Sequence, residues 1–465
     1  MDKEELKILI KERDHLFKLH KNSPNHPVHA SNYKKFRNKV NRKITKVKNN
    51  SYKQLFHVNK RDVKTTWNNI NHVLGRNKMS IDELIARNLG KKYPMKQVLD
   101  GFATSFTEGI ASVRHVCPVK TYSPVSSTVR PTRSLYLPYA HNDHVMDIIK
   151  HLDVNKSPGH DRIRACDLVN FSQLIAPVIT KLINLTILTG TIPDKLKIAV
   201  YRPLYKGSGS QSDYCNYRGI AILSVIHKIL ERFVYTNIID FLDEHKLLSP
   251  AQYGFQRHKG TNTLLEDFSQ YVNEGLNDRE HILLLLIDFS RAFQTLDHSL
   301  VIRALSDIGV RGDPLEWFKS YLSGRTFKVK VGDEYGETEG VDSGVPEGSL
   351  FGPIIFIIFT NLLGSLADSF LGVRLFLYAD DTAIVVRKKD LCEAERLMQL
   401  IFNIILRWSH DNGLTINATK TKLLHIRSPH FPTKQFRILA HTNDCLHSNL
   451  LNCVCPSKLL IIVDI

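Results

Sequence analysis

Three aspartates lie beside long apolar runs, and their positions indicate a shared chemical task. Asp380 and Asp381 are adjacent in the stretch FLYADDTAIVV, between two apolar runs, and Asp288 directly follows the apolar run in HILLLLIDFS. Two neighbouring carboxylates repel each other, and sharing a divalent cation removes that repulsion. If the two stretches lie side by side, the three carboxylates converge on one point. Such a site could hold two Mg²⁺ ions and is suited to nucleotidyl transfer.

The elements that would position these acids are strands. In RLFLYADDTAIVVR, β-branched and aromatic residues flank a charged pair, which predicts two strands joined by a two-residue turn with the acids at its tip. HILLLLIDFS is typical of a buried strand whose end carries Asp288. Each acid alone has a plainer interpretation, as a surface turn, a cap or a loop residue. Only the joint pattern favours a metal site.

The positive charge of the chain is concentrated near its N-terminus. The whole chain of 465 residues has a formal net charge of +17, and residues 1–80 alone hold 20 Lys and Arg against 6 Asp and Glu. Basic side chains neutralise phosphates and release counterions, so nucleic acid is the first partner to consider. The alternative is a solvated basic helix without a ligand.

Apolar segments and cysteines indicate the cellular compartment in which the protein is expected. The N-terminal MDKEELKILIKERD lacks the apolar core of a signal peptide, so an intracellular protein of nucleus or cytoplasm is expected, not a secreted one. The most apolar run, 354–363, is about half as long as a membrane span and predicts a core helix, so no membrane partner is expected. The seven scattered cysteines indicate reduced thiols, and the CVC at 453–455 has the wrong spacing for a zinc knuckle.

Composition and periodicity divide the chain into five expected segments. Residues 1–80 predict a basic helical region, and residues 81–140 a helical segment followed by a Pro- and Ser-rich linker, with a domain boundary near 140. Residues 141–265 and 266–425 alternate helical segments with short apolar strands, which predicts an α+β fold. Residues 426–465 form the last segment.

Ordered strings in the C-terminal two thirds resemble one known family. Four of them have the order and spacing of the palm motifs of reverse transcriptases: IDFSRAFQTLDH (287–298), SGVPEGSLFGPIIFIIFTNLL (343–363), FLYADDTAIV (376–385) and WSHDNGLTINATKTKLL (408–424). Three others resemble the finger segments of non-LTR retrotransposon enzymes of the LINE type, with Jockey-like elements as the candidate group: KSPGHDRI (156–163), 203–234 and 248–265. The resemblance implies a right-hand polymerase with fingers over 141–265, and a palm over 266–425 whose antiparallel sheet packs on helices.

The resemblance also implies an activity and roles for particular residues. It implies an RNA-directed DNA polymerase that extends a DNA 3′ end with dNTPs on an RNA template. Asp288 and Asp380 would be the principal ligands of two Mg²⁺ ions, with Mn²⁺ as the alternative metal, and Asp381 the supporting carboxylate. Phe293 matches the steric gate whose ring clashes with a 2′-hydroxyl and so selects dNTPs.

Four further residues would contact the nucleotide by the same resemblance. Lys206 and Arg218 match finger positions that meet the triphosphate. Gly348, in the turn GVPEGS, would let template and incoming nucleotide approach the backbone closely. Lys420, in ATKTK, matches a lysine that donates a proton to the pyrophosphate.

The chain departs from the usual strings of the family at several positions. Glu347 stands where a Gln is usual, and its carboxylate would repel an incoming dNTP. Gln294 replaces a common Asp, Gly219 a common Pro and Leu362 a common Asp. The last string, SKLLIIVDI (457–465), resembles an altered primer grip.

Because the chain ends after that string, we expect it to be a fragment of a mobile-element polyprotein that lacks the thumb, the domain after the palm. Two alternatives to the polymerase stay open. One is a catalytically inactive, nucleic-acid-binding remnant of a retrotransposon. The other is an RNA-dependent RNA polymerase, which Phe293 disfavours.

Overall fold

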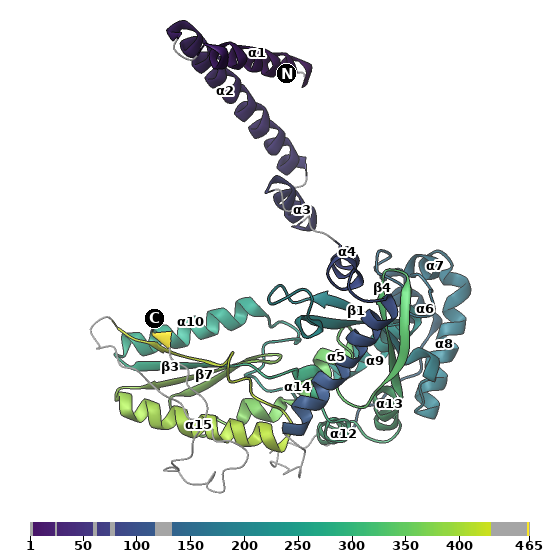
Figure 1. Ribbon diagram of the computed structural model, residues 1–465. Coiled ribbons are helices and arrows are strands. Elements are labelled where there is room, and N and C mark those ends of the chain that lie inside the picture. Colours follow the sequence, from purple (N-terminus) through teal and green to yellow (C-terminus); the bar gives the residue numbers. More distant parts are fainter. Residues whose placement is uncertain are drawn as a thin grey trace. The chain divides into compact units, whose positions relative to one another are not determined.

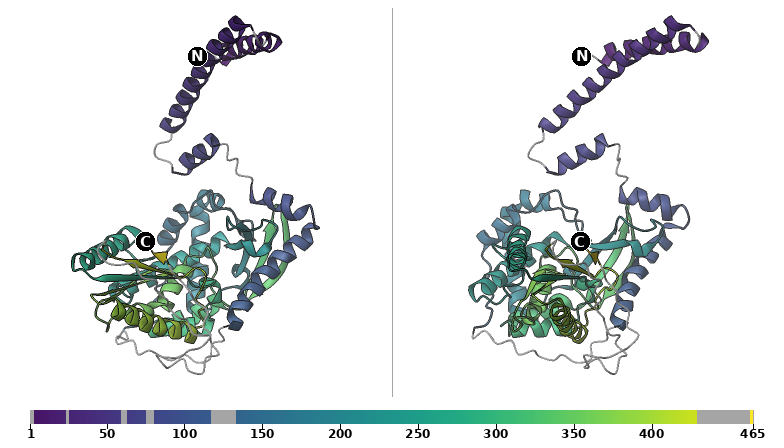
Figure 2. Two further views of the ribbon diagram at one scale, coloured as in Figure 1. Left: turned by 60° about the vertical axis from the view of Figure 1, so that its left-hand side comes forward. Right: turned by 90° about the vertical axis from the view of Figure 1, so that its left-hand side faces the viewer.

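The structure is a computed structural model in which two compact units are distinguished, Met1–Glu83 and Leu84–Ile465. Figures 1 and 2 show the elements of each unit. The described residues are 3–23, 26–58, 63–74, 80–116, 133–428 and 463–464. The domain boundary expected near residue 140 therefore falls inside the larger unit.

The smaller unit is helical, as expected for the basic region. It contains α1 (Lys3–Asn22), α2 (Pro27–Val58) and α3 (Val63–Val73). Helices α1 and α2 pack against each other, and the rings of Phe17 and Tyr33 lie 5.3 Å apart. On α2, apolar side chains recur every three or four residues, while these cationic side chains are exposed: Lys34, Lys35, Arg37, Lys39, Arg42, Lys46 and Lys48.

The first long helix of the larger unit packs against its first sheet. Helix α4 (Ile81–Ile85), which contains the boundary between the two units, leads through a π-helical turn to α5 (Met95–Val116), which packs against two strands of that sheet. Residues 117–132 of the predicted linker lie outside the described residues. The remainder of the predicted linker, residues 133–140, has no helix or strand, and its Leu135 and Leu137 are buried in the core. Part of the expected linker is therefore core structure.

The first sheet is mixed and has the order β2-β1-β4-β5. Strands β1 (Ile198–Tyr205) and β2 (Tyr217–Ile222) are antiparallel, β1 and β4 (Arg325–Val331) are parallel, and β4 and β5 (Glu334–Val341) are antiparallel. The other helices of the larger unit are α6 (Asn142–Lys150), α7 (Ala165–Asn170), α8 (Ser172–Thr189), α9 (Val225–Glu244), α10 (Thr261–Asn277), α11 (Ala292–Thr295), α12 (His298–Asp307), α13 (Asp313–Leu322), α14 (Phe351–Phe359) and α15 (Leu391–Asp411).

The second sheet has the order β6-β7-β3-β8-β9. Its central strand β3 (His281–Ile287) is antiparallel to both β7 (Asp381–Lys388) and β8 (Lys422–Ile426). The outer strands are β6 (Val373–Tyr378), antiparallel to β7, and β9 (Val463–Asp464), parallel to β8.

Both faces of this second sheet are covered by helices. Figure 1 shows α10 and α15 on opposite sides of β3 and β7. On β3, Ile282 and Leu284 belong to the cluster that contains residues of α10, whereas Leu283 and Leu285 belong to the larger core with α15. Because successive side chains of a strand point to opposite faces, a strand covered on both sides must be apolar throughout. This explains the apolar run up to Leu285, whereas Leu286 is 40% exposed.

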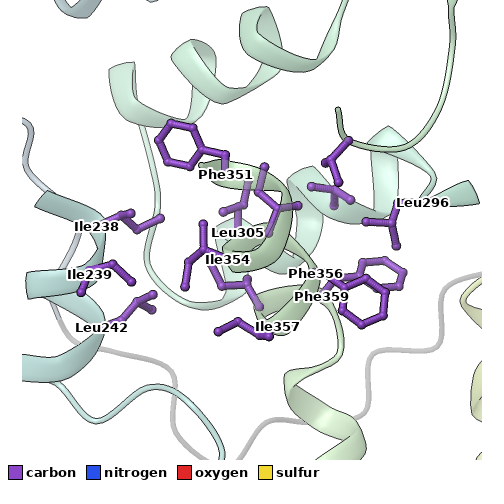
Figure 3. Packing of buried hydrophobic residues seen from close by; sticks show 14 of the residues in the cluster. Ile238, Ile239, Leu242, Leu296, Leu305, Phe351, Ile354, Phe356, Ile357 and Phe359 are labelled. Atoms are coloured by element: carbon purple, nitrogen blue, oxygen red, sulfur yellow. The ribbon is translucent and has the colours of Figure 1, made fainter. Parts of the chain in front are cut away.

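Helix α14 occupies the centre of the main core, as predicted for the most apolar run. Its side chains meet Ile238 and Leu242 of α9 and Leu305 of α12, as Figure 3 shows. Among the described helices, α8 is the one long and apolar enough to cross a membrane by length and composition, and its Ile179 and Ile183 are buried in this core.

Candidate active site

The adjacent aspartates lie where a two-residue turn joins β6 to β7, as predicted. The turn consists of Ala379 and Asp380, and Tyr378 pairs with Asp381, the first residue of β7. Ala379 has a left-handed backbone conformation with φ of 55°, which costs a non-glycine residue about 1 kcal/mol. The buried Gln252 supports this turn, because its Oε1 accepts a hydrogen bond from the Ala379 amide at 3.1 Å.

The third aspartate is brought to the same turn by strand register. Ile287, the last residue of β3, pairs with Thr382 of β7, so Asp288 follows β3 beside the turn. On its other side, the carbonyl of Asp288 accepts a hydrogen bond from the Asn417 amide at 2.7 Å. Residues far apart in the chain therefore fix the backbone on both sides of Asp288.

A cavity of about 640 Å³ opens beside the turn, a size typical of ligand sites. Of the eight residues predicted for the site, Asp381 is not part of its lining. The other seven line it: Lys206, Arg218, Asp288, Phe293, Gly348, Asp380 and Lys420.

The carboxylates at this cavity repel one another. Burial raises the pKa of Asp380, and the charges of Asp381 and Asp288 raise it further. Burial also raises the pKa of Asp381, as does the charge of Asp288. Asp288 Oδ2 is buried and accepts no hydrogen bond in the described structure, although Lys420 Nζ lies 3.6 Å from it. The positive charges of Lys420 and Arg218 therefore compensate these acids only in part.

A hard divalent cation fits these donors. The groups are carboxylate oxygens, which Mg²⁺ and Mn²⁺ prefer, and Asp288 offers a buried oxygen without a hydrogen bond. Within the described ranges, however, no three Asp, Glu, His or Cys side chains form a ready-made ligand group. Mg²⁺ commonly keeps several waters and substrate phosphates as ligands, so a partial set of protein ligands is usual for it. The convergence of the three aspartates on metal ions stays a prediction.

Cations line the same cavity from the first sheet. Arg218 lies on β2, and Lys206 follows β1, where its Nζ donates a hydrogen bond to the Cys215 carbonyl at 2.6 Å. Burial lowers the pKa of Lys206, and the charges of Arg291, Arg218 and Lys420 add to that lowering. Crowded cations of this kind favour a bound anion.

The position of Phe293 is set by the core beneath it. Its ring lies 4.7 Å from that of Phe356 on α14, and its carbonyl accepts a hydrogen bond from the Val345 amide at 2.9 Å. The side chain is half-buried and lines the cavity. A ring that packs on the core, on a backbone held by a hydrogen bond, can act as a steric barrier because it has little freedom to move aside.

The glycines of GVPEGS have a packing role in addition to the one expected. Gly344 has φ of 73°, and an added Cβ would collide with the backbone of Gln294. Gly348 has φ of 112°, and an added Cβ would lie 2.6 Å from the Ala221 carbonyl oxygen. The loop can therefore lie against both neighbouring segments only with glycine at these two positions.

Two features of the site were not foreseen. Gln252 is part of the string LSPAQYGFQRHKGTNTLL, but nothing in that string indicates that its side chain supports a turn near residue 379. Arg291 also lines the cavity, next to Gln294 and Glu347, and it lies inside the string IDFSRAFQTLDH. A basic residue three positions after Asp288 was the available signal for Arg291.

Comparisons with known proteins point to one family. Residues 209–443 match the family model described as reverse transcriptase (RNA-dependent DNA polymerase). The chain is 25% identical to an RNA-directed DNA polymerase from mobile element jockey of Drosophila melanogaster, over 60% of this chain and 31% of that protein. It is 25% identical to the jockey polymerase of Drosophila funebris, over 64% of this chain and 34% of that protein.

A third relative is the "Probable RNA-directed DNA polymerase from transposon BS" of Drosophila melanogaster, which is 26% identical over 60% of this chain and 31% of that protein. The chain thus spans about a third of the length of these curated relatives. The family model covers half of the chain, from the loop after β1 past the end of β8. The chain belongs to the reverse transcriptase (RNA-dependent DNA polymerase) family.

Proposed function

We propose that this chain is an RNA-directed DNA polymerase of a non-LTR retrotransposon, which adds dNTPs to a DNA 3′ end on an RNA template. The observation that carries the proposal is one cavity with carboxylates from the second sheet and cations from the first. A metal-bound nucleoside triphosphate requires both kinds of charge. Residues 141–265, which include β1, β2, α8 and α9, would form the fingers, and residues 266–425, which include β3, β6, β7 and α15, the palm. Strands β4 and β5 belong to the second range although they lie in the first sheet.

Each lining side chain has a task in this proposal. Lys206 and Arg218 would bind the triphosphate, because their positive charges line the same cavity as the acids. Phe293 would exclude a 2′-hydroxyl. Asp288, Asp380 and Asp381 would hold Mg²⁺ or Mn²⁺.

The ions, when bound, would neutralise phosphate charge and lower the pKa of the attacking 3′-hydroxyl. Lys420 would donate a proton to the leaving pyrophosphate. The position of its ammonium group, 3.6 Å from Asp288 Oδ2, supports a role beside the acids.

Template-dependent incorporation tests the proposal directly. The purified chain, supplied with poly(rA), an oligo(dT) primer, dTTP and Mg²⁺, is expected to extend the primer. Omitting poly(rA) should abolish extension, and replacing dTTP by UTP should reduce it strongly. The proposal is wrong if no primer, template or salt condition supports extension, or if Asp380→Ala extends the primer as well as the unmodified chain does.

A second candidate is nucleic-acid binding without catalysis, which the exposed cations of α2 favour. Binding by phosphate neutralisation weakens with salt, with a slope set by the number of phosphates contacted. Binding of RNA should therefore fall with salt in the unmodified chain and equally in Asp288→Ala/Asp380→Ala. A Lys34→Gln/Lys35→Gln/Arg37→Gln variant should have a shallower slope. An identical slope in that triple variant would argue against a role for α2.

A further inference from the structure

Three side chains on the wall of the cavity form a hydrogen-bonded series. Arg291 Nη1 donates to Gln294 Oε1 at 3.2 Å, and Gln294 Nε2 donates to Glu347 Oε1 at 2.8 Å. All three line the cavity. The partners determine the orientation of the amide, because a guanidinium can only donate and a carboxylate can only accept. The amide thus connects a cation to an anion.

The backbone around this series is held in place independently of it. The Gln294 carbonyl accepts a hydrogen bond from Ser343 Oγ at 3.1 Å, and the Glu347 carbonyl accepts one from the Ala221 amide at 2.9 Å. The segment after β3, the loop before α14 and strand β2 are thereby tied together. The backbone at positions 294 and 347 is therefore fixed by contacts that do not depend on the two side chains.

The charges near Glu347 determine which side chain at position 294 is favourable. Burial raises the pKa of Glu347 and the nearby charge of Asp380 adds to it, whereas Arg218 and Arg291 lower it. A second carboxylate at position 294 would face Glu347 directly and repel it. An amide there instead donates to Glu347 and accepts from Arg291. Both positions depart from the usual strings of the family, in which position 294 commonly has the acid and position 347 the amide.

We propose that Gln294 and Glu347 form one amide–carboxylate pair in which the amide and the acid have exchanged positions relative to the usual strings of the family. The pair positions Arg291 in the cavity as a third cation for the phosphates of the incoming nucleotide. The second half of this inference rests on the proposed polymerase function. Glu347 is then a positioning residue whose charge is compensated within the wall, and the repulsion of dNTP expected from its sequence position is offset.

The guanidinium of Arg291 has a close neighbour on α5, which offers a way to displace it. An added Cβ on Gly109 would lie 2.5 Å from Arg291 Cζ, so Ala at position 109 must push the guanidinium away. Gly109 is inside α5, where Ala is the better helix former by about 1 kcal/mol. Gly109→Ala should therefore displace Arg291 without weakening the helix or changing any charge.

The test is a double-mutant cycle on the full chain, with the dissociation constant of dTTP measured by titration calorimetry so that turnover is not needed. Glu347→Gln is expected to change the constant less than threefold, because Gln can still accept the Gln294 hydrogen bond. Gln294→Asp is expected to raise it about tenfold, within the range of coupling between contacting side chains. Gln294→Asp/Glu347→Gln should restore it to within about threefold.

Thermal unfolding supplies a readout that does not depend on nucleotide. The unfolding midpoint should fall in Gln294→Asp and recover in the double variant, because the repulsion is removed. The matched control is Gln270–Glu274 on α10, an exposed amide–carboxylate pair with a hydrogen bond of 3.0 Å. Gln270→Asp should change neither the dTTP constant nor the midpoint.

Arg291 is tested separately. Arg291→Gln and Gly109→Ala should each weaken dTTP binding about tenfold, with an unchanged or higher unfolding midpoint for Gly109→Ala. If the double variant shows no recovery in either readout, the exchanged pair is wrong. If Arg291→Gln binds dTTP like the unmodified chain, the positioning of Arg291 is wrong. Failure of the proposed function would look different: no primer extension by the unmodified chain, with both of these readouts still measurable.

Discussion

The two sheets contribute to the cavity in contrasting ways. The second sheet provides carboxylates at strand ends and in a two-residue turn, where register and the buried Gln252 fix the backbone. The first sheet provides Lys206 and Arg218, long side chains on a loop and an outer strand. Short side chains on a fixed backbone leave little freedom to compensate for a change, whereas long cationic side chains can readjust. Acids and cations should therefore differ in how much a substitution costs.

The largest expected effect is the loss of a fixed acid. Asp380→Ala should lower the rate of primer extension on the order of 10³-fold, the scale of losing a group that stabilises transition-state charge. RNA binding should change little. Asp368→Ala is the matched control, because Asp368 is an exposed acid outside the cavity lining. Equal losses in the two variants would contradict the special position of the turn.

The next effect is the loss of an adjustable cation. Arg218→Gln should raise the KM for dTTP about 10- to 100-fold, the worth of one or two charge-assisted hydrogen bonds. The turnover rate should change less than KM, because the acids are untouched. Lys181→Gln, an exposed cation on α8, is the control. If Arg218→Gln were as severe as Asp380→Ala, the contrast between the two sheets would be lost.

A smaller effect is expected from removing the Phe293 ring, which lines the same cavity as the acids and the cations. Phe293→Ala should improve the use of UTP relative to dTTP about tenfold, since a pocket discriminates a single added group only by a few kcal/mol. Phe293→Tyr retains the ring and should retain the preference for dTTP. Competition between the two nucleotides on one template measures the ratio. An unchanged ratio in Phe293→Ala would contradict the assignment of Phe293 as a steric gate.

The smallest effect concerns stability and pH. Burial and neighbouring acids raise the pKa of Asp380 in the folded chain, so the folded state binds more protons than the unfolded state between the ordinary and the raised pKa. The free energy of unfolding must then fall as pH rises through that window. Asp380→Asn should weaken this dependence and raise the unfolding midpoint at neutral pH by a few degrees. Without added metal, a lower midpoint would contradict the repulsion among the acids.

Local patterns predicted the elements that carry the acids. The apolar run before Asp288 and the two runs around Asp380 each predict a strand without information from the rest of the chain, because strand and turn preferences act over a few residues. The core helix over α14 was predicted for the same reason. No local pattern predicted that α5 packs on β4 and β5, because this contact joins segments more than 200 residues apart.

The sequence by itself determined the strands, the turn and the types of charge, since these depend on neighbours in the chain. Only the tertiary structure decided that Gln252 holds the turn at Ala379, and that Gln294 joins Glu347 to Arg291. These contacts depend on the register of separate strands and on the glycines that let the loop before α14 approach. Registers of that kind are set by packing of the whole core, so no single stretch of the chain contains them.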